Sequence, residues 1–172
     1  MRKYLLPLLF IFFFIFESTF VELLPMQLFQ SDLIIVPRFL IITILFMTMY
    51  GGKKQGIIYG FIFGLLFDVV YTEIIGIYLF MFPLVAYIIY NLMRIFQSNI
   101  VVASVTSLIG VGLLELGVYQ LNFLIKVTDM DFSTFIEIRL LPTMILNLIF
   151  LVLLAYPIKR LFEKHAEELK NE

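Results

Sequence analysis

Long apolar stretches recur along this chain and are separated by short polar gaps. A helix needs about 20 mainly apolar residues to cross the hydrocarbon of a bilayer, and the stretches have about this length. The pattern predicts six membrane-spanning helices, at residues 4–24, 33–50, 57–72, 75–93, 99–125 and 137–158, followed by a tail at 159–172. We therefore expect an all-α integral membrane protein, a six-transmembrane-helix bundle in which residues 1–172 form a single membrane domain.

The composition agrees with lipid as the main surroundings of the chain. Of its 172 residues, 62% are apolar, and the mean hydropathy is +1.06. A soluble domain of this size has too much surface for its volume to bury so many apolar side chains. The first apolar stretch resembles a signal peptide, but it contains Glu17 and ends without a small-residue cleavage site. We interpret it as a retained first span.

Basic residues lie mainly on one side of the predicted bundle. Nine of the 12 lysines and arginines belong to the N-terminus, the second and fourth gaps and the tail, which all face the same side. Cytoplasmic loops carry the excess of lysine and arginine in membrane proteins. We therefore expect a multi-pass protein with both termini in the cytoplasm, which only an even number of crossings allows.

The composition also argues against several kinds of site. The chain has no cysteine, and its single histidine, His165, lies in the charged tail. Disulfides, thiolate catalysis and metal sites built from sulfur or histidine are therefore not expected. The net charge of −1 gives no reason to expect a nucleic-acid partner. Since the chain shows no phosphate-binding or dinucleotide motif and no nucleophile beside an acid or base, we expect no enzyme and no cofactor.

Among the ionisable residues within the predicted spans or at their edges, five stand out: Glu17, Arg38, Asp68, Glu115 and Arg139. A rise of about 1.5 Å per residue places all five in the outer half of the membrane. We name them the outer polar cluster and predict that they form buried ion pairs. Alternatively, Arg38, Asp68 and Arg139 snorkel to the nearby surface, while Glu17 and Glu115 face the interior. The inner half has no ionisable residue within a span, so an ion pump is not expected.

Gly56, Gly60, Gly64 and Asp68 follow one another at intervals of four residues. On a helix they form one straight stripe, and small residues allow another backbone to approach closely. We name these four residues the glycine stripe. It is a candidate packing face for another helix of this chain, or for a partner such as a second copy in a homodimer or a different membrane protein.

The last span carries a further polar face. Arg139, Thr143 and Asn147 share it by the same four-residue spacing. The amide of Asn147 lies in the middle of the span, where it needs a hydrogen-bond partner on another segment. Beyond the span the tail alternates in charge, with Lys159 four residues before Glu163. We expect the tail to be a solvated helical extension, or alternatively a docking site for a cytoplasmic protein.

Several of these segments resemble one known family. Residues 60–68 (GFIFGLLFD), followed by 76–78 (GIY), resemble the GFxxGLLxD…G segment of the bacterial rod shape-determining protein MreD family. The resemblance covers essentially the whole chain and extends to residues 36–39 (VPRF), 114–115 (LE) and 139–143 (RLLPT) with Asn147.

The resemblance implies a non-enzymatic component of the elongasome in the bacterial cell membrane. It implies contact with an MreC-like bitopic membrane protein and, directly or indirectly, with MreB, RodA and a penicillin-binding transpeptidase that build lateral peptidoglycan. It also implies a fold like the six-helix substrate-binding subunit of energy-coupling-factor vitamin transporters. Two other functions stay open: a small-molecule (vitamin-like) binding subunit of an importer, and a flippase-like protein that handles lipids.

Overall fold

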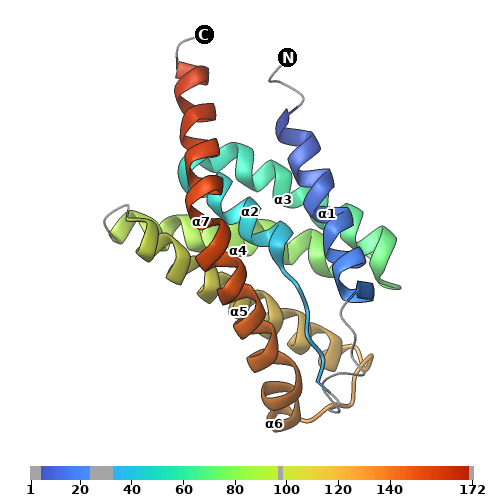
Figure 1. Cartoon of the computed structure of the whole chain (residues 1–172). Helices are drawn as coiled ribbons and strands as arrows, with labels where there is room; N and C mark the ends of the chain where they lie inside the picture. Colours follow the sequence, from blue (N-terminus) through green and yellow to red (C-terminus); the bar gives the residue numbers. More distant parts are fainter. Residues whose placement is uncertain (1–4, 24–32, 97–98, 171–172) are drawn as a thin grey trace.

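The computed structural model describes residues 5–23, 33–96 and 99–170, and every regular element in these ranges is helical (Figure 1). In chain order the elements are α1 (Leu5–Leu23), α2 (Phe39–Phe46), the π-helical turn η3 (Met47–Gly51), α3 (Lys53–Tyr71), α4 (Ile77–Ile95), α5 (Ile100–Leu124), α6 (Phe132–Thr134), the π-helical segment η4 (Phe135–Leu140) and α7 (Leu141–Lys170). The predicted ends of the first span, at residues 4 and 24, and the last two residues of the predicted tail lie outside the described residues.

Five helical segments within the described ranges are long and apolar enough to cross a membrane. They occupy residues 6–23, 53–71, 77–95, 100–124 and 132–168, and correspond to the predicted spans 4–24, 57–72, 75–93, 99–125 and 137–158. The prediction of an all-α, multi-pass membrane protein is thereby confirmed, and the first, third, fourth and fifth spans agree with it to within a few residues.

The second predicted span differs from a simple transmembrane helix. Residues 33–38 are not helical and form an extended stretch (Figure 1), and the helix that follows, Phe39–Gly51, is shorter than a full crossing. The cause is Pro37, which lacks an N–H donor and disfavours helical backbone at Val36 before it. The prediction of a continuous helix over 33–50 is therefore wrong for its first six residues.

The last helical segment begins five residues before the predicted span 137–158, because α6 and η4 precede α7 without a break from Phe132. Asp131 caps its start, since the Asp131 side chain accepts hydrogen bonds from the hydroxyl and the N–H of Thr134. These hydrogen bonds hold the pKa of the Asp131 carboxyl below its usual value.

The predicted helical extension of the tail is present through Lys170, and Lys159 pairs with Glu163 at 3.5 Å. The extension is not fully solvated, however. Phe162 is completely buried, with its ring 6.2 Å from the ring of Phe10 in α1. The first turn of the tail therefore belongs to the packed bundle.

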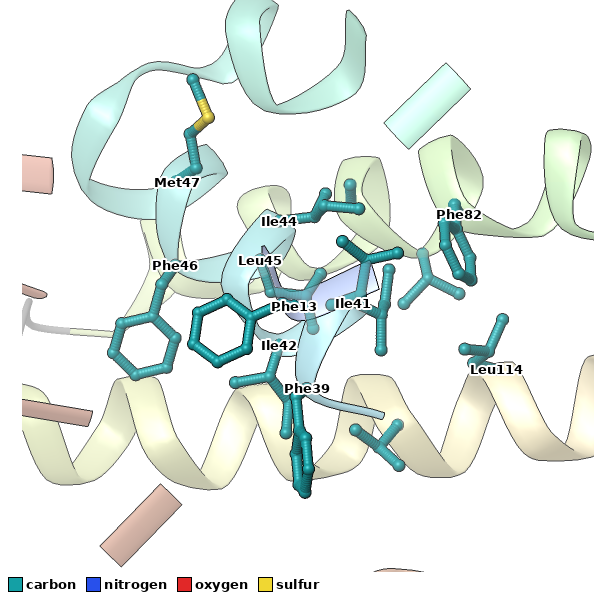
Figure 2. Close-up of a cluster of buried hydrophobic side chains, with 14 of the residues drawn as sticks. Phe13, Phe39, Ile41, Ile42, Ile44, Leu45, Phe46, Met47, Phe82 and Leu114 are labelled. Atoms are coloured by element: carbon teal, nitrogen blue, oxygen red, sulfur yellow. The ribbon is translucent and has the colours of Figure 1, made fainter. Parts of the chain in front are cut away.

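Helix α2 lies at the centre of the molecule. All eight of its residues are buried, and Figure 2 shows Phe39, Ile42 and Leu45 of this helix among side chains from the surrounding helices. The stacked rings of Phe39 and Phe150, 4.2 Å apart, join α2 to α7. A short helix can occupy this position because its residues are apolar except Thr43, whose hydroxyl donates to the carbonyl of Phe39 in the same helix.

The outward faces of the long helices are also apolar. Val152 and Leu153 of α7 are 77% and 69% exposed, and Leu8 of α1 is 65% exposed. Water would penalise so large an apolar exterior, whereas hydrocarbon solvates it. The polar side chains must then face inward, which is where the candidate site is found.

Candidate functional site

Side chains of α7 hold the extended stretch before α2 in place. The Thr143 hydroxyl accepts a hydrogen bond from the N–H of Val36 at 3.1 Å. The Asn147 side chain accepts from the N–H of Arg38 at 2.8 Å and donates to the carbonyl of Val36 at 3.0 Å. Nonhelical backbone is tolerated at membrane depth only where protein groups satisfy it. The predicted polar face of the last span therefore supplies the hydrogen bonds that residues 33–38 cannot make among themselves.

Glu17 of α1 caps the start of α2. Its carboxylate accepts a hydrogen bond from the N–H of Leu40 at 2.7 Å, and its side chain is 5% exposed. The first N–H groups of a helix have no partner within the helix and carry partial positive charge. A carboxylate at this position satisfies a donor and is stabilised by the helix dipole, so the interior position predicted for Glu17 has a direct physical reason.

Arg38, Glu115 and Arg139 form a buried group that we name the arginine–glutamate triad. The Nε of Arg38 lies 2.5 Å from one oxygen of Glu115, and the Nε of Arg139 lies 2.9 Å from the other. The side chains of Arg38 and Glu115 are 2% and 0% exposed, whereas that of Arg139 is 29% exposed. The structure thus brings three members of the predicted outer polar cluster together as ion pairs.

The guanidinium of Arg38 is enclosed on its other sides by aromatic residues. It donates to the hydroxyl of Tyr78 at 2.9 Å, and it lies 5.1 Å from the Tyr78 ring and 5.7 Å from the Phe67 ring. These contacts replace water around a buried cation. The alternative that Arg38 and Asp68 snorkel to the surface is therefore wrong, since their exposed fractions are 1% and 0%.

Asp68, the fifth member of the outer polar cluster, pairs with backbone instead of with either arginine. Its two oxygens accept hydrogen bonds from the N–H groups of Gly76, Tyr78 and Leu79 at 2.8 to 2.9 Å. The end of α3 thus caps the start of α4 and closes the two helices into a hairpin. Gly76 adopts φ 123°, a conformation that glycine reaches without a steric cost.

The glycine stripe packs within the chain. An added Cβ at Gly56 would meet the backbone of Thr48 in η3 at 2.7 Å, and one at Gly64 would meet the carbonyl oxygen of Tyr78 in α4 at 2.5 Å. At Gly60 it would meet the backbone of Pro83 at 3.2 Å. Of the two uses predicted for the stripe, the structure shows the packing face, and it is occupied by this chain's own η3 and α4. A second copy or another partner would have to bind a different face.

The interactions of this site stabilise the fold. Glu17 and Asp68 each satisfy backbone donors, and Glu115 neutralises two guanidinium groups, so these three carboxylates are engaged inside the protein. Within the described ranges no three His, Cys, Asp or Glu residues are grouped so that they could hold a metal ion.

The sequence pattern did not identify Tyr78, which connects the Asp68 cap to the arginine–glutamate triad. Its N–H is bonded to Asp68 and its hydroxyl to Arg38. The available signal was its place two residues after Gly76, near the start of the predicted span 75–93. An aromatic residue with a hydroxyl at such a position can both start a helix and reach a buried charge.

Comparison with known proteins identifies the family of this chain. The family model described as "rod shape-determining protein MreD" matches residues 1–165. The chain is similar to the rod shape-determining protein MreD of Bacillus subtilis (strain 168), with 33% identity over 172 residues that cover 100% of both chains. It is also similar to the cell shape-determining protein MreD of Streptococcus pneumoniae (strain ATCC BAA-255 / R6), with 30% identity over 128 residues, 74% of this chain and 76% of the relative. No solved structure shows a significant match. Since the family model and the Bacillus relative both extend over nearly the whole chain, this protein belongs to the MreD family of rod shape-determining proteins.

Proposed function

We propose that the chain is a non-enzymatic membrane scaffold of the bacterial elongasome and helps to maintain rod cell shape. It would do so by linking an MreC-like bitopic protein to the MreB cytoskeleton and to lateral peptidoglycan synthesis by RodA and a penicillin-binding transpeptidase. The observation that carries this proposal is the family match over residues 1–165, together with relatives whose names state a role in cell shape.

The geometry is suited to a scaffold. The arginine–glutamate triad, the caps at Glu17 and Asp68 and the bonds from Asn147 all fix one arrangement of the helices. The surfaces that remain for a partner in the bilayer are the apolar outer faces, such as that of α7 with Val152 and Leu153. Association between helices in lipid relies on packing of preformed surfaces, because the hydrophobic effect does not favour helix contact over lipid contact. A rigid interior therefore helps to present a partner with a constant outer face.

We further propose that the extended stretch and the short helix together make a sixth crossing. Residues 33–38 at about 3.3 Å per residue and residues 39–51 at about 1.5 Å per residue span roughly 39 Å, compared with about 30 Å of hydrocarbon. The start of α1 and the end of α7 lie at the same end of the molecule, at the top of Figure 1. Both features support six crossings with the two termini in the cytoplasm.

Depletion and replacement in a rod-shaped host test the proposed function. Cells that lose the native protein should become round, and expression of this chain should restore rods and allow an MreC-like protein to be co-purified with it. An empty vector is the negative control, and a chain with Gly112→Ala, where an added Cβ would meet only the end of Met144 at 3.7 Å, should restore rods as the unchanged chain does. Normal rods after depletion, together with the absence of any shape protein in the pull-down, would refute the proposal.

A groove beside Glu17 favours one alternative function. It is lined by residues that include Glu17, Ser18, Pro37 and Tyr71, and its volume of about 370 Å³ is within the range of small-molecule sites. This groove supports a vitamin-like binding subunit of an importer as the second candidate. Mass spectrometry of the gently purified protein distinguishes the two: a stoichiometric bound metabolite favours the importer, and its absence alongside a bound MreC-like protein favours the scaffold.

A further inference from the structure

A second groove lies far from the arginine–glutamate triad, between the start of α1 and the final turns of α7. Leu6 of α1 and Pro157 and Leu161 of α7 provide its apolar lining, and its volume is about 440 Å³. The remaining lining residues, all from α7, are Arg160, Lys164, His165 and Glu168. The α7 residues recur every three or four positions, so they occupy one face of the helix. Figure 1 shows the two helix ends next to each other at the top of the molecule.

The position of the cations along α7 corresponds to the lipid head groups. The apolar part of the helix ends at Ile158, which is buried, and charged residues begin at Lys159. Arg160 and Lys164 follow Ile158 by two and six residues, about 3 and 9 Å along the axis. The head-group layer outside the hydrocarbon is roughly 5 to 8 Å thick on each side of a bilayer. Arg160 therefore lies within this layer and Lys164 at its outer edge, so the groove extends from the acyl region into the layer that contains the lipid phosphates.

The charges in the groove are unbalanced. Its lining carries two cations, Arg160 and Lys164, against one carboxylate, Glu168, and the neighbouring Lys159 pairs with Glu163 at 3.5 Å. In the part of the chain that the structure describes, the side chains of Arg160 and Lys164 make no ion pair or hydrogen bond. Two unpaired cations one turn apart thus stand at the polar end of a cavity whose other end is apolar. Cationic pockets of this kind between membrane helices are typical binding sites for acidic lipid head groups.

We propose that this groove binds one anionic phospholipid from the leaflet that the ends of α1 and α7 face. Its phosphodiester would lie between Arg160 and Lys164, and an acyl chain would pack along Leu6, Pro157 and Leu161. A zwitterionic phospholipid fits less well, because its ammonium group adds a positive charge next to two others. Each basic residue near a membrane surface strengthens binding to anionic lipid by about five-fold, so the pair contributes roughly thirty-fold.

Native mass spectrometry of the full chain in mild detergent tests the site directly. The protein is titrated separately with dioleoylphosphatidylglycerol, with dioleoylphosphatidylethanolamine and with soluble glycerol phosphate. We expect one tightly bound phosphatidylglycerol, binding of phosphatidylethanolamine at least ten-fold weaker, and no retained glycerol phosphate, because half of the site recognises acyl chains. The variant R160Q/K164Q should lose roughly thirty-fold in phosphatidylglycerol affinity and its preference over phosphatidylethanolamine.

The matched control is R94Q/K126Q, which removes one arginine and one lysine from exposed positions outside the groove. This control should bind phosphatidylglycerol as the unchanged protein does. Equal affinity for the two phospholipids, an unaltered preference in R160Q/K164Q, or an equal loss in the control would each overturn the proposal. Retention of glycerol phosphate as tightly as the lipid would overturn it as well, because the groove would then be an anion site without lipid recognition.

Discussion

The side chain of Asn147 forms hydrogen bonds with more backbone groups than any other polar side chain of α7 for which contacts are described. Its amide bonds to the N–H of Arg38, the carbonyl of Val36 and the carbonyl of Thr143. An apolar residue of similar size would leave the Arg38 N–H and the Val36 carbonyl buried without a partner. The cost of such groups, and not the intrinsic strength of the bonds, determines what the residue contributes.

Asn147→Leu should therefore lower the free energy of unfolding by about 1–3 kcal/mol. The measurement is reversible unfolding of the purified protein in mixed detergent, followed by circular dichroism. Asn91→Leu is the control, since the Asn91 side chain bonds only to a carbonyl of its own helix at an exposed position. Equal stability of the two variants would mean that the 33–38 stretch does not depend on the Asn147 amide.

The arginine–glutamate triad is expected to respond unequally to the loss of its members. Glu115→Gln leaves the buried Arg38 guanidinium without a counter-charge and should cost about 3–5 kcal/mol. Arg139→Gln removes a partner that is 29% exposed and should cost about 1 kcal/mol or less. Detergent unfolding of both variants measures the difference.

A double variant distinguishes the effect of the buried charges from the effect of side-chain packing on stability. Replacing Arg38 with Met and Glu115 with Leu removes both buried charges together, so most of the loss in Glu115→Gln should be recovered. If the double variant is as unstable as Glu115→Gln, packing around the two side chains and not the uncompensated charge is responsible.

Gly64 allows the hairpin of α3 and α4 to close. A methyl group at this position would come within 2.5 Å of the Tyr78 carbonyl oxygen, which is backbone and cannot rotate away. Gly64→Ala should therefore lower the free energy of unfolding by about 1–3 kcal/mol, since the two helices must separate.

Gly112 in α5 offers a matched control, because an added Cβ there would have only the flexible end of Met144 at 3.7 Å as its nearest neighbour. Gly112→Ala should be neutral, or stabilising by up to about 1 kcal/mol through helix propensity. Unfolding of the two variants side by side checks the contrast. Similar destabilisation in both would show that close approach of α4 is not what Gly64 provides.

The helices and the hairpin could be predicted from the sequence, whereas the partners of the buried charges could not. Apolar length alone located four spans to within a few residues. The spacing of Gly60, Gly64 and Asp68 identified a packing face, but not that α4 would cover it. Pro37 was a visible reason for the 33–38 stretch to leave the helix, and Asn147 a visible unsatisfied amide. Asn147 and its partner Arg38 lie more than 100 residues apart in the sequence, and a local pattern carries no information on such a pairing.

Helix α2 is buried inside the bundle, unlike the five long helices. A helix surrounded by other helices has no lipid-facing side, and its eight residues are all buried. The extended stretch before it can cross part of the membrane only because α7 satisfies its backbone on the inside of the bundle. The proposed sixth crossing thus depends on tertiary contacts, unlike the five long helices, which satisfy their own backbone.

Cysteine labelling can test that crossing directly, because the protein contains no cysteine that would have to be removed first. Single cysteines replace the exposed residues Lys54, Glu73 and Asp129, and a fourth is carried on a tag before Met1. With six crossings, a membrane-impermeant maleimide added to intact cells should label Glu73→Cys and Asp129→Cys but neither Lys54→Cys nor the tag. Labelling of all four after permeabilisation shows that every cysteine is reactive. If the stretch and α2 only dip into the bilayer, the tag and Lys54→Cys must lie on opposite sides, because α1 would then be the single crossing between them.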